Sequence, residues 1–274
     1  MMNSSSYSAA ADVPNSPFSH KLRSILFYIW LTVVTVIWFI PSLLIGPFLP
    51  LKARNYWVMG IHCRLVIFGL RWIAGIRCEV EGRENIPSDG RGYVLISKHQ
   101  STWETFMLPT LIYPHVQVVK KELSYLPFFG WGLQLIQPIF INRNKKTNAL
   151  KQVIQQGEVR LKAGIHVLVF PEGSRIPSGK RKLFSKGGAM LATKTAAPVI
   201  TIAHNSSEHW PNTHWVKSPG VIRMVISTPI ETAGMSTADL NELTETWINE
   251  QVDRISDLPF QGEYVEAVTS GKRF

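Results

Sequence analysis

A histidine and a glutamate lie five residues apart where a predicted strand gives way to a predicted helix. The run Ser97–Glu104, which contains His99, directly follows the apolar stretch Tyr93–Ser97. Five residues correspond to about 140° around an ideal α-helix, so His99 and Glu104 meet only if His99 lies in the turn before the helix. In that geometry the carboxylate binds one ring nitrogen and leaves the other as a general base of fixed tautomer.

A second interpretation of the same stretch needs no catalysis. Ser101 is followed three residues later by Glu104, which is the spacing of a helix capping box. In that motif the glutamate satisfies a backbone N–H at the start of the helix. These residues alone leave both interpretations open.

Basic side chains and a glycine lie at the ends of other predicted strands. In a Phe-Pro-Glu-Gly-Ser-Arg run after a buried strand, Gly173 permits close approach of a ligand, and Arg175 offers a planar guanidinium to a phosphate. Arg143 follows one further predicted strand, and Lys120 is the last residue of another. Because open α/β sheets bind ligands at the carboxyl ends of their strands, we expect these groups and His99 to lie close together.

Several kinds of chemistry have no support in the sequence. There is no Gly-x-Ser-x-Gly nucleophile motif and no His-Glu-x-x-His zinc motif. Cys63 and Cys78 are the only cysteines, which excludes a disulfide scaffold and a four-thiolate zinc site.

Two weaker patterns are also set aside. The stretch Gly173–Lys180 resembles a phosphate-binding P-loop, but it has five residues between its glycines and Arg181 where Ser or Thr is required. Three histidines recur at intervals of five, a spacing that cannot place them on one helical face. We predict loop and surface positions for these histidines and no metal site; they are His204, His209 and His214.

The elements that must position these residues alternate between strands and helices. Helical spacing of apolar residues predicts helices over Thr147–Lys162 and Thr237–Ile255. We predict an α/β fold with a mixed sheet flanked by helices. Short β-rich runs predict the strands Cys78–Val80, Tyr93–Ser97, Val116–Lys120, Ile139–Ile141, His166–Phe170, Val199–Ala203 and Val221–Ser227.

An apolar region precedes this sheet. The sequence predicts a disordered tail over residues 1–20, a membrane-associated helical hairpin over 21–75, and a globular domain over 76–274. From Ser24 to Leu51 there are 28 uncharged residues, more than the roughly 20 that cross a bilayer as a helix. Both flanks are basic, so the positive-inside rule gives no orientation. We favour a hairpin that dips into one leaflet over a full span followed by an interfacial helix.

Composition restricts the partners. Only 18% of the 274 residues are charged, against 45% apolar, which excludes a disordered or coiled-coil protein. The net charge of +10 is concentrated between Phe140 and Met190, a segment that contains eleven basic residues and two acidic ones. An anionic partner is expected there. Few aromatics interleave with these charges, which disfavours nucleic acid.

Four sequence blocks, in order and spacing, resemble those of the glycerolipid acyltransferase family of membrane lipid synthesis. One family position, usually Asp, is Glu104 here. Another, commonly Asn, is Lys98 and adds a cation beside the site. The blocks are the His-x-x-x-x-acid run at Lys98–Glu104, Phe-Ile-x-Arg at Phe140–Arg143, Phe-Pro-Glu-Gly-Ser-Arg at Phe170–Arg175, and a Pro-Val strand at Ala197–Ile200.

The resemblance implies an acyltransferase, with residues 76–274 as the acyltransferase domain. By it, His99 deprotonates the free hydroxyl of lysophosphatidic acid, which attacks an acyl thioester directly, while Glu104 orients the imidazole. It further implies acyl-CoA or acyl carrier protein as donor, contact with membrane lipid, no cofactor or metal, and a bacterial inner membrane with the catalytic domain on the cytoplasmic side. The residues that it assigns to the acceptor phosphate are Arg143, Glu172, Gly173 and Arg175, with Lys120 as an addition.

Two alternatives remain open at this point. The acceptor could be another lysolipid or glycerol 3-phosphate, in which case the same chemistry acts on a different hydroxyl. Alternatively, the basic middle of the chain could bind anionic lipid without catalysis. Acceptor competition and the response to loss of His99 separate these alternatives.

Overall fold

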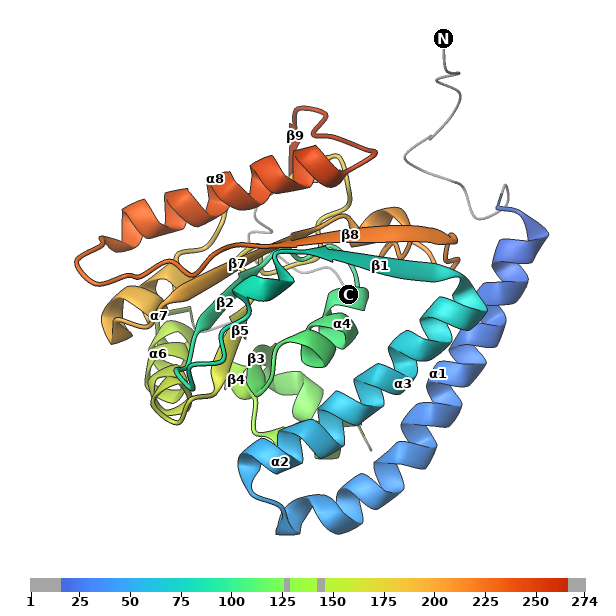
Figure 1. Ribbon diagram of the computed structural model, residues 1–274, viewed down its shortest axis with the longest axis horizontal. Coiled ribbons are helices and arrows are strands. Elements are labelled where there is room, and N and C mark those ends of the chain that lie inside the picture. Colours follow the sequence, from blue (N-terminus) through green and yellow to red (C-terminus); the bar gives the residue numbers. More distant parts are fainter. Residues whose placement is uncertain (1–15, 126–128, 142–145, 266–274) are drawn as a thin grey trace.

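The structure, a computed structural model, describes residues 16–125, 129–141 and 146–265. A single large sheet separates two helical layers (Figure 1). One layer is the N-terminal hairpin, defined here as Phe18–Ala74, together with α4 (Trp103–Leu111). The other consists of α6 (Lys146–Lys162), α7 (Gly187–Thr195) and α8 (Thr237–Ile255).

The sheet is mixed, as predicted. Its order is β1-β8-β7-β2-β5-β3-β4, and the five strands from β7 to β4 run parallel to one another. Strand β8 is antiparallel to β7, and β1 is parallel to β8. The bounds are β1 Ile76–Glu81, β2 Val94–Ser97, β3 His115–Lys120, β4 Ile139–Ile141, β5 His166–Val169, β7 Val199–His204 and β8 Gly220–Ile226.

The central strands are apolar along their length because both faces of the sheet are covered. Leu95 and Leu168 pack into the cluster on the hairpin side, whereas Val94 and Val167 pack beneath α6, α7 and α8. Register follows this alternation, since Val94 is paired with Val167 and Leu95 with Leu168. A one-residue slip would exchange the two faces, so the pattern fixes where each strand ends.

The hairpin consists of two antiparallel helical arms side by side (Figure 1). The first arm is α1, Phe18–Ile45, which continues through Pro41. The return arm contains α2 (Leu51–Asn55), a π-helical turn at Tyr56–Ile61, α3 (His62–Gly69) and a second π-helical turn at Leu70–Ala74. The helix begins three residues before the predicted boundary at residue 21, and residues 1–15 of the predicted tail lie outside the described part.

Close packing joins the two arms. A Cβ at Gly69 would lie 2.1 Å from the Trp30 ring, so the arms approach closely only because this residue has no side chain. The indole N–H groups of Trp30 and Trp38 donate to the carbonyls of Leu65 and Trp57, each at 3.0 Å. These hydrogen bonds between the arms provide acceptors for two indole N–H groups, which lipid acyl chains could not do.

The outer surface of α1 is apolar. Ile29, Val36, Ile37 and Ile40 are all more than half exposed. By length and composition, Phe18–Phe48 and Leu51–Ala74 are each candidate membrane spans. A contiguous apolar face of this kind is typical of a membrane contact.

A small two-stranded ribbon, which the sequence did not predict, lies beyond the main sheet. It pairs β6 (Lys180–Arg181) with β9 (Glu263–Tyr264). The Lys180 ammonium lies 2.6 Å from Glu263, and Arg181 also pairs with Asp253 of α8. The ribbon ties the loop after β5 to the end of the described chain.

Candidate active site

The carboxyl ends of the parallel strands bring the predicted site residues together. His99 follows β2, Lys120 is the last residue of β3, and Gly173 and Arg175 follow β5. These four residues line one cavity. Arg143 lies outside the described residues.

His99 and Glu104 meet in the geometry that the spacing predicted. His99 lies in the turn before α4, which begins at Trp103, and its Nδ1 is 2.8 Å from Oε1 of Glu104. The imidazole also stacks on the Phe170 ring, with centroids 4.2 Å apart and planes tilted by 20°. The ring is therefore held by a carboxylate at one edge and by an aromatic face, while 16% of its side chain stays exposed to the cavity.

The contacts of a capping box are present as well. The Ser101 hydroxyl accepts the N–H of Trp103 at 2.9 Å, and Oε1 of Glu104 accepts the N–H of Ser101 at 3.0 Å. Glu104 additionally accepts the hydroxyls of Ser101, at 2.9 Å, and Ser206, at 3.3 Å. The same buried carboxylate therefore contacts both the start of the helix and the histidine ring, so capping does not prevent Glu104 from orienting His99.

The charge on Glu104 determines the tautomer of His99. Burial acts to raise the pKa of Glu104, but the hydrogen bond from His99 and the nearby His204 outweigh it and lower the pKa to about 2. An ionised carboxylate can only accept, so Nδ1 of His99 carries the proton. In the described residues Nε2 has no hydrogen-bond partner, which leaves its lone pair available to a substrate proton.

Protonation of Glu104 at low pH should lower the free energy of unfolding. Because the folded-state pKa is below the unfolded value near 4.5, this group stabilises the protein above that value and loses the effect as pH falls toward 2. We expect wild type to lose about 2 kcal/mol more stability between pH 5 and pH 3 than Glu104→Gln does. Unfolding midpoints of both proteins in the same detergent across that range check this. Parallel curves would contradict a depressed pKa.

Glu172 does not face the cavity, contrary to the role that the resemblance implied. It is only 2% exposed, and its Oε1 is paired with Lys98 Nζ, which is itself 1% exposed. Oε2 accepts the backbone N–H of His99 at 2.8 Å. With both oxygens occupied inside the protein, Glu172 cannot contact an acceptor phosphate. Lys98 likewise adds no cation to the site surface, because its ammonium points into the interior.

The buried pair makes a prediction about stability. Lys98→Met should destabilise the protein by about 3–5 kcal/mol, because it leaves the Glu172 carboxylate buried without a counter-ion. The double variant Lys98→Met/Glu172→Gln should recover most of that loss. Thermal unfolding in detergent measures both. Equal destabilisation of the single and double variants would argue against the pair.

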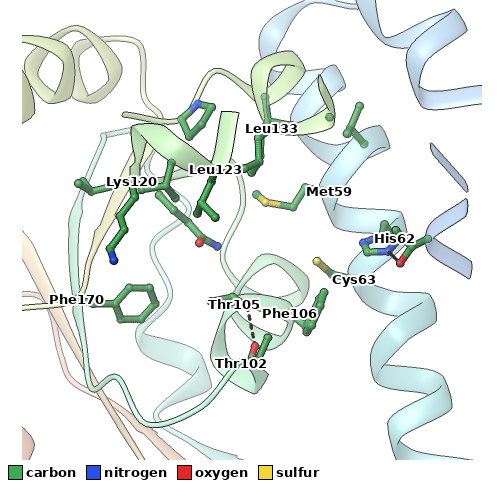
Figure 2. Close-up of a pocket in the computed structure, with 18 of the residues that line it drawn as sticks. Met59, His62, Cys63, Thr102, Thr105, Phe106, Lys120, Leu123, Leu133 and Phe170 are labelled. Carbon is green, nitrogen blue, oxygen red and sulfur yellow. Dashed lines mark hydrogen bonds between the residues drawn. The ribbon is translucent and has the colours of Figure 1, made fainter. Parts of the chain in front are cut away.

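The cavity has a volume of about 720 Å³ and extends from the strand ends to the hairpin. Figure 2 shows Met59, Cys63 and Phe106 between the strand side, marked by Phe170, and the hairpin side, marked by His62. Lys120 lies on the same side as Phe170 (Figure 2). The cavity therefore has a cationic end at the sheet and an apolar end within the hairpin.

The loop after β5 supplies the remaining polar lining. Gly173 has a φ of +67°, which favours glycine, and a Cβ there would meet nothing within 4 Å. Ser174 also lines the cavity, and its hydroxyl accepts from Lys182 Nζ at 2.9 Å. Lys182 thus lies next to the site, although sequence reasoning did not single it out. Arg175 is exposed at the cavity wall.

His204 corrects another prediction. It is not a loop or surface residue: it is the last residue of β7 and is fully buried. Its Nε2 lies 2.9 Å from the Lys98 carbonyl. His209 is also nearly buried, at 9% exposed. Within the described part of the chain, no cluster of three or more His, Cys, Asp or Glu side chains could hold a metal ion.

Comparison with known proteins identifies the family. A family model described as Acyltransferase matches residues 77–205. A 1-acyl-sn-glycerol-3-phosphate acyltransferase from Pseudomonas aeruginosa is 45% identical over 240 residues, which cover 86% of this chain and 93% of the relative. The chain belongs to the acyltransferase family. This acyltransferase also matches a yeast 1-acyl-sn-glycerol-3-phosphate acyltransferase at 27% identity, over 89% of this chain and 80% of that one.

A solved structure supports the fold of this acyltransferase. The crystal structure of the 1-acyl-sn-glycerophosphate (LPA) acyltransferase PlsC from Thermotoga maritima superimposes with a TM-score of 0.73. The two chains are 25% identical, and the match covers 86% of this acyltransferase and 95% of PlsC. The predicted α/β fold with a mixed sheet and the family resemblance are both confirmed.

Proposed function

We propose that this acyltransferase transfers a fatty acyl group from a thioester to lysophosphatidic acid and forms phosphatidic acid. The observation that carries the proposal is the His99–Glu104 pair at one end of a cavity whose other end lies inside an apolar hairpin. A phosphorylated lipid with one acyl chain matches both ends of that cavity. The names of the bacterial and yeast relatives support the same acceptor.

In this mechanism His99 is the general base. Its Nε2 removes the proton from the free glycerol hydroxyl as the oxygen attacks the thioester carbonyl. The carbon–sulfur bond then breaks, and the thiolate takes the proton from the imidazolium. Glu104 keeps the ring in the Nδ1–H tautomer and stabilises the imidazolium that forms. No covalent acyl-enzyme and no cofactor or metal takes part in this sequence.

The acceptor phosphate would bind at the cationic end of the cavity. Arg175 and Lys120 line it from two strand ends, and the open space beside the Gly173 backbone allows close approach. Arg143 is proposed for the same phosphate on the basis of the family block that it belongs to. Glu172 is excluded from this set because it is buried beside Lys98.

The hairpin would place the site at a lipid surface. Because residues of both arms line the cavity, including Trp38 and Met59, an acyl chain could pass from the bilayer to His99 without crossing water. We propose a re-entrant hairpin in a bacterial inner membrane, with the sheet on the cytoplasmic side. Acyl-CoA and acyl carrier protein thioesters both fit this arrangement.

Removing Arg175 should weaken acceptor binding selectively. We expect Arg175→Ala to raise the KM for lysophosphatidic acid about tenfold or more, because a charge-assisted bond to phosphate is lost. Monoacylglycerol, which has no phosphate, should react equally poorly with both proteins. Steady-state assays with the two acceptors measure this, and Arg77→Ala on the exposed edge strand β1 is the matched control. An equal loss with both acceptors would argue against a phosphate contact.

Product formation tests the function directly. Detergent-purified protein should convert labelled acyl-CoA or acyl carrier protein thioester and lysophosphatidic acid into phosphatidic acid. Competition with glycerol 3-phosphate and other lysolipids then ranks the acceptors. Preference for one of these over lysophosphatidic acid would keep the mechanism but replace the proposed acceptor.

A further inference from the structure

The peptide group that joins Lys98 to His99 is held at both of its polar atoms by side chains. Its N–H donates to Oε2 of Glu172 at 2.8 Å. Its carbonyl oxygen lies 2.9 Å from Nε2 of His204 and also accepts the Ser97 hydroxyl, which lies on β2 itself, at 3.0 Å. Glu172 follows β5 and His204 ends β7, which are the two strands that flank β2. Side chains at the ends of both neighbouring strands therefore hydrogen-bond to the backbone immediately before the proposed base.

Both side chains are themselves fixed. Glu172 is paired with Lys98, and both are buried, so the carboxylate cannot turn toward solvent. His204 is fully buried, and its ring packs edge-on against Trp103 with centroids 5.5 Å apart. Because a carbonyl oxygen only accepts, Nε2 of His204 carries the proton. Its Nδ1 then accepts the Ser206 N–H at 3.5 Å.

The adjacent backbone bonds complete the restraint. The carbonyl of His99 accepts the N–H of Ile176 at 2.8 Å, and the N–H of Lys98 donates to the carbonyl of Ile202 at 2.9 Å. The backbone donors and acceptors on both sides of the imidazole are thus all engaged. Rotation of the Lys98–His99 peptide would break three side-chain bonds, to Glu172, His204 and Ser97, and would redirect the Cα–Cβ bond that aims the imidazole.

We propose that Glu172, Lys98 and His204 form a clamp on this peptide and act as positioning residues for His99. The inference rests on the proposed role of His99 as general base. None of the three contacts the substrate in this scheme; each acts through the orientation of His99. Misplacement of a reacting group by about 1 Å can cost about 100-fold in rate, so such a clamp has a measurable effect.

The first test compares His204→Phe with His204→Gln in the full-length, detergent-purified enzyme. Phe retains a ring but cannot donate to the Lys98 carbonyl, whereas the Gln amide can. We expect His204→Phe to lower kcat for acyl transfer about 10- to 100-fold with both KM values unchanged, and His204→Gln to recover most of that loss.

A matched control separates positioning from general stability. His166 is another buried histidine with a backbone bond, in which Nδ1 accepts the Tyr93 N–H at 3.1 Å. It begins β5, at the opposite end of the strand from the site. His166→Phe should lower the unfolding temperature but leave kcat per folded molecule unchanged.

A second pair of variants tests the hydrogen bond between Glu172 and the His99 N–H. This pair also tests the clamp if His204→Phe does not fold. Lys98→Met/Glu172→Gln removes both charges but retains an oxygen for the His99 N–H. Lys98→Met/Glu172→Met removes that oxygen as well. We expect the Gln form to have a kcat about tenfold or more above the Met form at a similar unfolding temperature.

The outcomes distinguish a failure of the clamp from a failure of His99 as the general base. Wild-type kcat in folded His204→Phe, or equal kcat in the two double variants, would overturn the clamp while His99→Ala remains inactive. Wild-type activity in His99→Ala would instead overturn the proposed base. A fall in kcat that His204→Gln does not relieve would assign His204 to packing alone and also overturn its place in the clamp.

Discussion

Replacing His99 with alanine is expected to lower the rate of phosphatidic acid formation about a thousandfold, within the range that general bases contribute. The loss should fall on kcat, because Arg175 and Lys120, which we propose bind the acceptor phosphate, and the apolar cavity remain in place. Initial rates with saturating thioester and varied lysophosphatidic acid measure kcat and KM separately.

The fold should survive this change. His99 makes its side-chain contacts to Glu104 and Phe170 at the edge of the cavity, and no core cluster includes it. Unfolding temperatures of the two proteins in detergent provide the check. A folded His99→Ala protein with a rate within tenfold of wild type would falsify the base assignment.

Glu104→Gln should produce the second largest loss, about 100-fold in kcat. The amide is nearly isosteric with the carboxylate and can still accept the Ser101 N–H, so the start of α4 is retained. It cannot stabilise the imidazolium with a negative charge, and its NH₂ group can select the wrong tautomer. Comparison of kcat over pH 5 to 9 with wild type measures this loss.

Glu104→Asp tests the length of the side chain separately from its charge. The charge is kept but the side chain is shorter by one methylene, so the 2.8 Å contact with His99 must lengthen or the turn must move. We expect an activity between those of wild type and Glu104→Gln. If Gln were as active as wild type, the carboxylate would serve the helix cap alone.

The pairing of His99 with Glu104 was predictable because it depends on local geometry. A separation of five residues across a strand–helix junction has one way to bring the side chains together, and the structure confirms it. The seven predicted strands were also predictable, since each is a β-rich run, and all lie within two residues of the observed bounds.

Contacts between distant strand ends could not be predicted in the same way. Lys98 and Glu172 are 74 residues apart, and only the order β2–β5 in the sheet shows that they are neighbours. Nothing in either run indicates that their charges face inward. His204 was missed for a related reason, because β7 extends one residue beyond its apolar stretch.

Two helices escaped prediction because glycine weakens their helical signal. α5 (Phe129–Ile136) contains Gly130 and Gly132, and α7 begins with two glycines. Packing overrides that propensity. A Cβ at Gly132 would lie 2.3 Å from the Phe39 ring, so this residue allows α5 to lie directly on α1.

The hairpin is more than an anchor, because its side chains belong to the hydrophobic core on one face of the sheet. Phe27, Val66 and Leu70 pack in one cluster with Leu95 and Leu168 of the central strands. A truncated protein that began at β1 would keep only α4 in this layer and would expose the apolar side chains that the hairpin covers. During synthesis the hairpin also emerges from the ribosome before any strand. We therefore expect the sheet to assemble onto helices already delivered to the bilayer, which would make membrane insertion an early step of folding itself.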